Sequence, residues 1–367
     1  MNLLKSAALF IKRDPVLAAS AFLAALSAFF VPPSPEYISY IDFRVLALLL
    51  SLMLLVAGFN KAGLFAVLTE RLLRLCHSIR ALACVLFCLC FFGSMFITND
   101  VALITFVPLT IMVLKQTKKT EHMILFIVLQ TVAANLGSML TPLGNPQNLY
   151  LYSSFGLDMW QFLRIMAVPT AGSFILLTAS VFLLPKEEIA PSGEKSELGE
   201  ISPWLILFIL CLLAVVHLFH YAAVLAVVVC YVFIKDRLLL FRADYALLLT
   251  FVFFFIFIGN MKSIPAVSRW LSNIISGREM TIGILLSQAI SNVPAAMLMS
   301  GFTKDFAPLL LGVNLGGLGT LIASMASLIS YKLYGALEDS KKGKYLITFT
   351  AVNVAFLALL WIFVLII

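Results

Sequence analysis

The sequence predicts an all-α polytopic membrane protein. Of its 367 residues, 62% are hydrophobic and only 12% are charged, whereas a soluble domain carries about twice that charged fraction. Long uncharged runs recur from residue 16 to the C-terminus, each close to the ~20 residues that a helix needs to cross ~30 Å of hydrocarbon. The net charge of +7 suggests nucleic-acid binding only in a soluble chain. Here we assign it to cytoplasmic Lys and Arg residues that orient the chain in the bilayer.

Nine stretches are expected to cross the bilayer: 16–31, 43–59, 121–155, 161–184, 203–218, 221–234, 243–259, 305–331 and 345–367. Two further apolar stretches, 81–114 and 280–303, are interrupted by polar residues and are expected to enter and leave on the same side. A polar linker divides the chain into an N-terminal repeat (1–184), a cytoplasmic linker (185–202) and a C-terminal repeat (203–367) with one extra leading helix.

Stretch 280–303 decides the orientation of the second half. Its 24 uncharged residues would form a helix of ~36 Å, which suffices for one crossing or one re-entrant hairpin but not for two crossings. Pro294 lies near its middle and removes a backbone donor. A hairpin places the Lys-rich loop 332–344 in the cytoplasm, as the positive-inside rule favours. We therefore expect a cytoplasmic N-terminus and an external C-terminus in a bacterial-type inner membrane.

The two halves share a residue pattern. The sequence NLGS at 135–138 recurs as NLGG at 314–317, an offset of 179 residues, and upstream of these ITN at 97–99 is matched by ISN at 290–292. Because the matched segments run in opposite directions in the expected topology, we predict two inverted repeats, each with a re-entrant hairpin and a discontinuous transmembrane helix. The residue pairs that the comparison aligns are Thr98 with Ser291, Asn99 with Asn292, Thr141 with Thr320, Asn145 with Ser324, Asn148 with Ser327, and Asp42 with Asp244.

Four segments should interrupt the helices near the centre of the bilayer: 98–100, 141–148, 291–294 and 312–320. Non-helical backbone at that depth must be buried in protein or line a wet cavity. The N–H groups of the resulting half-helices can face an anion, and freed carbonyls can face a cation. Single Ser and Thr residues in membrane helices often serve only packing, but four breaks at matched positions favour a binding site.

The candidate site contains no catalytic residues and needs no cofactor beyond a coupling ion, Na⁺ or H⁺. Its predicted substrate- and ion-binding residues are Thr98, Asn99, Asp100, Thr141, Gly144, Asn145, Asn148, Ser291, Asn292, Thr320, Ser324 and Ser327. We expect sodium sites, if sodium couples transport, near Asn99, Asp100 and Asn145 in one half and near Asn292 and Ser324 in the other.

Asp100 is the only carboxylate deep in an apolar stretch. An intramembrane acid is costly and marks a functional site by default. Its counterpart in the second half is Val293, so its role would be confined to one repeat. Three roles remain open from sequence: a proton carrier, a cation ligand, or a cap on the half-helix that follows.

Three motifs resemble those of the ion transporter superfamily of bacterial permeases: ITND at 97–100, GNPQN at 144–148 and SNVP at 291–294. That superfamily includes citrate-type and dicarboxylate–sodium symporters, arsenite permeases and some sodium/proton antiporters. The resemblance implies two hairpin tips that bind substrate and sodium, an elevator-like transport domain, and a dimer formed through a scaffold domain. Asp100 and Val293 stand where the symporter motif has its third polar residue. The resulting Asn-Asp pair and Asn-x-Pro hairpin are more similar to the arsenite permeases.

The sequence therefore favours a secondary active transporter of a small anion or oxyanion, coupled to Na⁺ or H⁺ and working as an elevator-type homodimer in the lipid bilayer. An arsenite-type efflux permease and a cation/proton antiporter are the alternatives. An intramembrane enzyme is disfavoured, because the chain has no His-Glu-x-x-His motif and no second membrane aspartate. Nucleic acid is not expected as a partner.

Overall fold

The described part of the chain is built of helices, which confirms the all-α class. The computed structural model describes residues 15–74, 76–182, 184–188 and 197–366, and within them the only β-type pairing is an isolated bridge between Ser78 and Glu188. The helices are α2 (Pro15–Ala28), α3 (Glu36–Tyr40), α4 (Phe43–Lys61), α5 (Leu64–Leu73), α6 (Ile79–Ile97), α7 (Asn99–Gln116), η1 (Thr120–His122), α8 (Met123–Ser138), α9 (Pro146–Ser154), α10 (Met159–Val181), α11 (Ser202–Val215), α12 (Tyr221–Asp236), η2 (Arg237–Arg242), α13 (Tyr245–Ser263), α14 (Pro265–Ile275), α15 (Glu279–Ile290), α16 (Asn292–Ser300), α17 (Phe306–Leu315), η3 (Leu321–Ala323), α18 (Met325–Gly335) and α19 (Lys342–Ile366).

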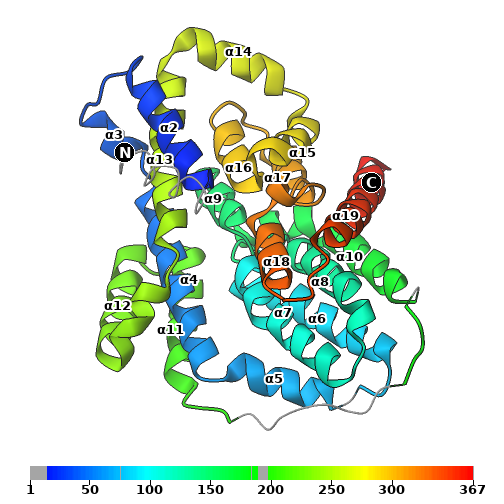
Figure 1. The fold of residues 1–367 in the computed structure, drawn as a ribbon. Helices are drawn as coiled ribbons and strands as arrows, with labels where there is room; N and C mark the ends of the chain where they lie inside the picture. The colour runs from blue at the N-terminus through cyan, green and yellow to red at the C-terminus, as the bar shows by residue number, and fades with distance from the viewer. Residues whose placement is uncertain (1–14, 75, 183, 189–196, 367) are drawn as a thin grey trace, which may run out of the picture.

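Two bundles lie side by side (Figure 1). The first bundle comprises α2, α4, α11, α12 and α13, in which α2 packs against α13 and α12 packs against α4. The second bundle comprises α6–α10 and α15–α19. Two shorter helices, α5 at the bottom of Figure 1 and α14 at its top, run from the first bundle towards the second at opposite ends. Each bundle therefore combines helices from both halves of the chain.

Two helices of the first bundle begin in the same way. The Asp42 carboxylate accepts a 3.1 Å hydrogen bond from the Val45 N–H at the start of α4, and the Asp244 carboxylate accepts one of 2.9 Å from the Leu247 N–H at the start of α13. Such N-caps satisfy N–H groups that have no partner within the helix. After each of these helices the chain continues in one order: a short helix, a helix pair, a broken helix and a long helix.

Seven helical segments in the described residues are long and apolar enough to cross a membrane: α4, α6, α7, η1 with α8, α10, α13 and α19. The expected crossings at 16–31, 203–218 and 221–234 correspond to the shorter helices α2, α11 and α12, of 14, 14 and 16 residues. The length and apolar composition of these helices are those expected of a polytopic membrane protein.

The two helix pairs differ in length. The second pair has arms of 12 and 9 residues, α15 and α16, or about 18 and 14 Å at the α-helical rise. Neither arm alone spans ~30 Å of hydrocarbon. The first pair, α6 and α7, has arms of 19 and 18 residues, and each is long enough to cross. That stretch 81–114 forms a re-entrant hairpin therefore stays a prediction. A re-entrant hairpin and two full crossings by α6 and α7 would both return the chain to the side from which it entered.

Candidate functional site

One residue joins the two arms of each helix pair. Thr98, between α6 and α7, has φ +68° and ψ 150°, and Ser291, between α15 and α16, has φ +75° and ψ 153°. A positive φ is unusual for any residue with a Cβ, and for a β-branched threonine it is an outlier that the surrounding structure must hold in place. These two residues are ones that the sequence comparison aligns, and both tips turn with the same strained backbone geometry.

The two broken helices restart in the same conformation. The first is interrupted between α8 and α9, where Asn145 precedes α9 with φ −144° and ψ 146°. The second is interrupted between α17 and α18, where Ser324 precedes α18 with φ −143° and ψ 139°. Helix breaks are therefore present where the sequence predicted them, but with shifted bounds: the structure interrupts the helices at 139–145 and 316–324, against the predicted 141–148 and 312–320. Asn145 and Ser324 are the last residues of the two observed breaks.

Asn135 joins the first helix tip to the second broken helix. Its side-chain oxygen accepts hydrogen bonds from the Asn99 amide at 2.9 Å and from the Ser324 hydroxyl at 3.0 Å. Its amide nitrogen lies 3.5 Å from the Gly317 carbonyl oxygen. All of these side chains are buried. One amide therefore connects both halves of the chain at the centre of the second bundle.

Asn314 makes the equivalent connection in the other direction. Its side-chain oxygen accepts a 3.3 Å hydrogen bond from the Asn145 amide, just as the Asn135 oxygen accepts one from Ser324. Its own amide donates to the Asn148 side-chain oxygen at 2.7 Å. Asn99, Asn145, Asn148 and Ser324 are thus brought together, but through two asparagines that were not among the predicted site residues.

Four helices begin at this centre without a side-chain cap. The side chains of the residues preceding α7, α9, α16 and α18 accept no capping hydrogen bond from the N–H groups of the helix that follows. The starts of α7 and α9 are adjacent, because the Asn99 N–H donates to the Gly144 carbonyl at 3.0 Å. Uncapped helix N-termini carry partial positive charge and present N–H groups, so they suit an anion.

Freed carbonyl groups at the breaks are bonded by amide side chains. The Asn148 amide lies 3.2–3.4 Å from the carbonyl oxygens of Ser138, Met139 and Thr141 at the end of α8. In the second half, the Gln288 amide donates to the carbonyls of Gly316 and Leu318 at 2.9 and 3.0 Å. These contacts stabilise the irregular backbone, as non-helical chain at membrane depth requires.

Asp100 lies in the first turn of α7 but does not cap it. Its backbone N–H donates to the Asn99 side-chain oxygen at 2.9 Å, and its Oδ1 is buried without a hydrogen-bond partner among the described residues. The position that precedes the helix belongs to Thr98. The geometry therefore gives no support to the capping role and leaves a carboxylate oxygen free to receive a proton or a cation.

The remaining predicted residues have varied surroundings. The Thr141 hydroxyl bonds the Met95 carbonyl and accepts from the Gly144 N–H at 3.1 Å. The Asn292 amide lies beside Gly317, and the Ser327 hydroxyl is buried without a partner in the described chain. Thr320 is exposed, and it bonds Gln288 rather than the central asparagines. The structure therefore does not bring Thr320 into the network.

Sequence reasoning missed Asn135, Asn314 and Gln288 as site residues. The first two were visible as the opening residues of the repeated NLG motif, but they were used there only to align the halves. Gln288 stands three residues before Ser291 in an otherwise apolar arm. An amide side chain in an otherwise apolar helix is a signal that could have identified all three.

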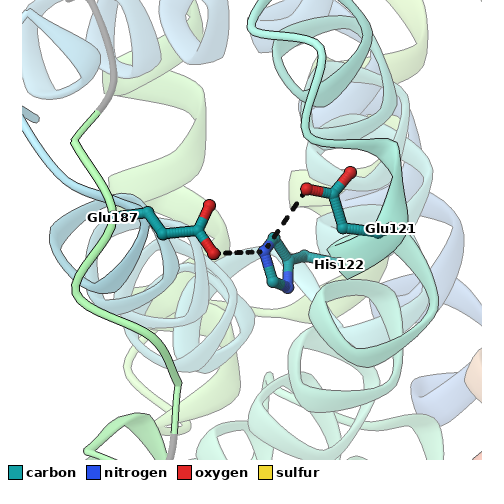
Figure 2. A group of neighbouring side chains, drawn as sticks. All are labelled: Glu121, His122 and Glu187. Atoms are coloured by element: carbon teal, nitrogen blue, oxygen red, sulfur yellow. Dashed lines mark ion pairs between the residues drawn. The ribbon is translucent and has the colours of Figure 1, made fainter.

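A separate polar cluster lies at one end of the second bundle, beside the turn between α7 and α8. Figure 2 shows His122 between Glu121 and Glu187, with its Nε2 at 3.8 and 3.7 Å from their carboxylate oxygens. These three ligand atoms lie within 4.8 Å of one another, a spacing that a metal ion could use. Lys119, however, already pairs with Glu187, so the cluster is best described as an ion-pair anchor.

That anchor fixes the chain that follows α10. The Glu187 carbonyl accepts a 2.8 Å hydrogen bond from the Ile79 N–H at the start of α6. The hydrogen bond from Lys119 lowers the pKa of the Glu187 carboxyl below its ordinary value. Because the pKa is lowered in the folded state, the contribution to stability is present above the ordinary pKa and is lost as the pH falls through the lowered one.

Comparison with known proteins is consistent with this architecture. A family model described as citrate transporter (CitMHS) matches residues 7–329. An uncharacterized transporter of Methanocaldococcus jannaschii is 35% identical over 246 residues, which cover 66% of this chain and 68% of that protein. The inner membrane protein YbiR of Escherichia coli is 32% identical over 316 residues, covering 83% and 84%. A putative transporter of Dictyostelium discoideum, named arsB, is 28% identical over 167 residues, covering 45% and 29%.

The family match extends across both helix pairs and the start of the second broken helix, and so includes the amide network described above. The relatives that cover most of the chain are a transporter and an inner membrane protein. The chain is a multi-pass membrane transporter rather than an enzyme, and it belongs to the CitMHS citrate transporter family of the ion transporter superfamily.

Proposed function

We propose that the chain is a secondary active transporter of a small anion or oxyanion, coupled to Na⁺ or H⁺ and moving by an elevator mechanism. The observation that carries the proposal is the buried amide network that joins Asn99, Asn135 and Ser324, and its counterpart around Asn314. It gathers polar groups from both halves of the chain at one place, beside four uncapped helix starts. Transporters built from repeats bind substrate and ion at such a place.

The architecture proposed is a pair of inverted repeats with re-entrant hairpins. Three pairs of residues aligned by sequence have matching roles: Thr98 and Ser291 at the tips, Asn145 and Ser324 at the helix restarts, and Asp42 with Asp244 at the long helices. Chance alignment gives no reason for three such coincidences of backbone conformation. In this proposal the second bundle carries the site, and the first bundle is the scaffold through which a homodimer would form.

The chemistry of the centre suits an anion held without a fixed positive side chain. No Lys or Arg takes part in the hydrogen bonds around Asn135 and Asn314, so the charge of an anion would be met by N–H groups of the helix starts. Amide, hydroxyl and carboxylate oxygens nearby could hold Na⁺, and the free oxygen of Asp100 could instead take a proton.

An arsenite-type efflux permease is the second candidate. Undissociated arsenite is neutral at physiological pH, so it requires no fixed charge, and the ITND sequence at 97–100 has the acid that the resemblance to arsenite permeases implies. The similarity to a putative transporter named arsB points the same way, although it covers 45% of this chain. Transport direction distinguishes the two candidates experimentally.

Uptake into proteoliposomes tests the proposal. Purified protein is supplied with radiolabelled citrate, succinate, phosphate or arsenite under an imposed Na⁺ or proton gradient. If both hairpin tips contribute ligands, Asn99→Ala and Asn292→Ala should each abolish gradient-driven uptake, because each removes an amide from the site. Both variants should elute as folded protein on gel filtration.

Asn353→Ala is the matched control. Asn353 is also a buried asparagine in an apolar helix, but it bonds the Phe349 carbonyl in its own helix and lies outside the network. Its replacement should leave uptake close to that of the wild type. Wild-type uptake by both tip variants would show that the tips only pack, and the proposed site would be wrong.

A further inference from the structure

A cavity of about 400 Å³ leads from the protein surface to the first helix tip. The second bundle contributes Thr98 and Asp100 of the tip and Pro146, which directly follows Asn145 at the start of α9. The first bundle contributes Asn60 of α4 together with residues around the start of α13. The cavity therefore lies between the two bundles and gives access to the predicted site from one face.

Among the described residues that line this cavity, Arg242 is the only Lys or Arg. It is the last residue of η2, two positions before the N-cap of α13, and it is exposed. Within the described chain its guanidinium makes no hydrogen bond or ion pair, although it interacts electrostatically with Asp236, whose direct partner is Lys61. An unpaired guanidinium offers a planar set of donors that matches carboxylates and oxyanions.

Two carboxylates line the cavity together with Arg242, and the negative charge of each interacts with a further positive group. Asp244 already accepts a hydrogen bond from the Leu247 N–H, and it lies at the positive end of α13. Asp100 is the carboxylate to which the proposed function assigns the coupling cation. Once that cation is bound, the charge of Asp100 is cancelled, and Arg242 remains as the cationic side chain that an incoming substrate meets in this cavity.

The opposite face has a smaller cavity with a similar pair of charges. It measures about 260 Å³ and is lined by Asp42 and Lys262, together with Tyr150 and Ser154 of α9. No residue of either helix tip lines it. Of these two cavities, therefore, the one at Arg242 connects a cationic side chain with the predicted site.

We propose that Arg242 is a specificity-determining residue, which recruits the negatively charged group of the substrate at an outer subsite before it reaches the helix tips. The ligand class is a carboxylate or oxyanion. The inference rests on the proposed anion transport and adds the residue that selects for charge. It also explains how a centre without Lys or Arg can prefer anions, because selection takes place at the entrance.

The expected topology places Arg242 on the cytoplasmic face, so the test measures citrate uptake into inside-out proteoliposomes by the wild type, Arg242→Gln, Arg242→Lys and Arg237→Gln. Arg242→Gln should raise the KM for citrate about tenfold, the loss expected for a hydrogen bond to a charged group, with little change in kcat. Arg242→Lys keeps the charge and should recover part of the affinity. Arg237 lies in the same η2 segment and is exposed, but it does not line the cavity, so Arg237→Gln should leave KM unchanged.

Ionic strength provides a readout that needs no variant. In the wild type, KM for citrate should rise as an impermeant salt screens the attraction to Arg242, and in Arg242→Gln this dependence should largely disappear. An unchanged KM in Arg242→Gln, or an equal rise in Arg237→Gln, would overturn the inference while leaving anion transport intact. Failure of the wild type to take up any anion would instead overturn the proposed function, and the inference with it.

Discussion

Asp100 is the residue at which coupling can be tested most directly. Replacement by Asn keeps the size of the side chain and a hydrogen-bonding group but removes the titratable charge. If Asp100 carries the proton or binds Na⁺, Asp100→Asn should fold and exchange substrate, but lose accumulation against a gradient by at least about tenfold, as expected for loss of a charged partner. Proteoliposomes with an imposed Na⁺ or proton gradient measure this.

Asp158→Asn is the control for the acid-to-amide change. Asp158 caps α10, where it accepts a 2.7 Å hydrogen bond from the Gln161 N–H, and Asn is an equally good cap. Its gradient-driven accumulation should match the wild type. Undiminished accumulation in Asp100→Asn as well would remove Asp100 from the mechanism and leave coupling to the neutral amides and hydroxyls.

Residue identities in the site were partly predictable from sequence. Asn99 and Asn145 stood out because they accompany proline, glycine or polar neighbours in apolar stretches, and Ser324 because it aligns with Asn145 in the repeat. Asn135 and Asn314 lie inside regular helix, at the ends of α8 and α17. Nothing in the local sequence shows that their side chains reach the opposite half, because that contact depends on tertiary packing.

At the scale of elements, Gly144 shows how tightly the first break is built. A Cβ placed on Gly144 would lie 2.0 Å from the Ser138 carbonyl oxygen, a backbone atom that cannot move aside without shifting the chain. Gly144→Ala should therefore destabilise the protein by about 1–3 kcal/mol, the usual cost of overpacking, and should lower transport. Thermal unfolding in detergent measures the loss of stability.

Gly343→Ala is the comparison, because nothing lies within 4 Å of the added Cβ at that position. Its unfolding temperature should equal or slightly exceed that of the wild type, since Gly343 is near the start of α19 and Ala favours helix. Equal stability of Gly144→Ala and the wild type would mean that the break between α8 and α9 can rearrange, contrary to the close packing described.

The lengths of elements were predicted less well than their existence. Each of the predicted segments 98–100, 141–148, 291–294 and 312–320 overlaps an observed interruption, since proline, glycine and polar residues oppose helix in a recognisable way. The observed interruptions are Thr98, 139–145, Ser291 and 316–324. The arms of the two helix pairs are unequal, at 19 and 18 residues against 12 and 9. Hydropathy alone does not reveal this difference, because the apolar runs continue through the turns.

At the scale of the whole molecule, the orientation of the chain is open to a labelling test. With the native cysteines replaced, a cysteine at Gly343 should react with a membrane-impermeant reagent only from the cytoplasm, and one at Ser276 only from outside. Ser192, which lies outside the described residues, should behave like Gly343. Labelling of Gly343 from outside would mean that stretch 280–303 crosses the membrane, and the inverted arrangement would be wrong.

The division into two bundles could not be predicted from sequence position. The predicted N-terminal and C-terminal repeats are divisions by sequence position, whereas each bundle contains helices from both halves of the chain. Contacts such as the 2.9 Å hydrogen bond from the Asn260 amide of α13 to the Ser27 hydroxyl of α2 join segments more than two hundred residues apart within one bundle. Hydrophobicity is shared by all of these helices, so it does not show which of them pack together.

The presence of a single carboxylate among the central amides and hydroxyls determines how a carrier of the proposed kind responds to voltage. With Asp100 ionised, the unloaded centre has one negative charge, and the membrane field acts on it with about 2.3 kcal/mol per 100 mV for full passage. A bound proton or Na⁺ at Asp100 cancels that charge. The membrane potential then drives the return of the unloaded carrier, while the loaded step feels only the charge that the substrate itself brings.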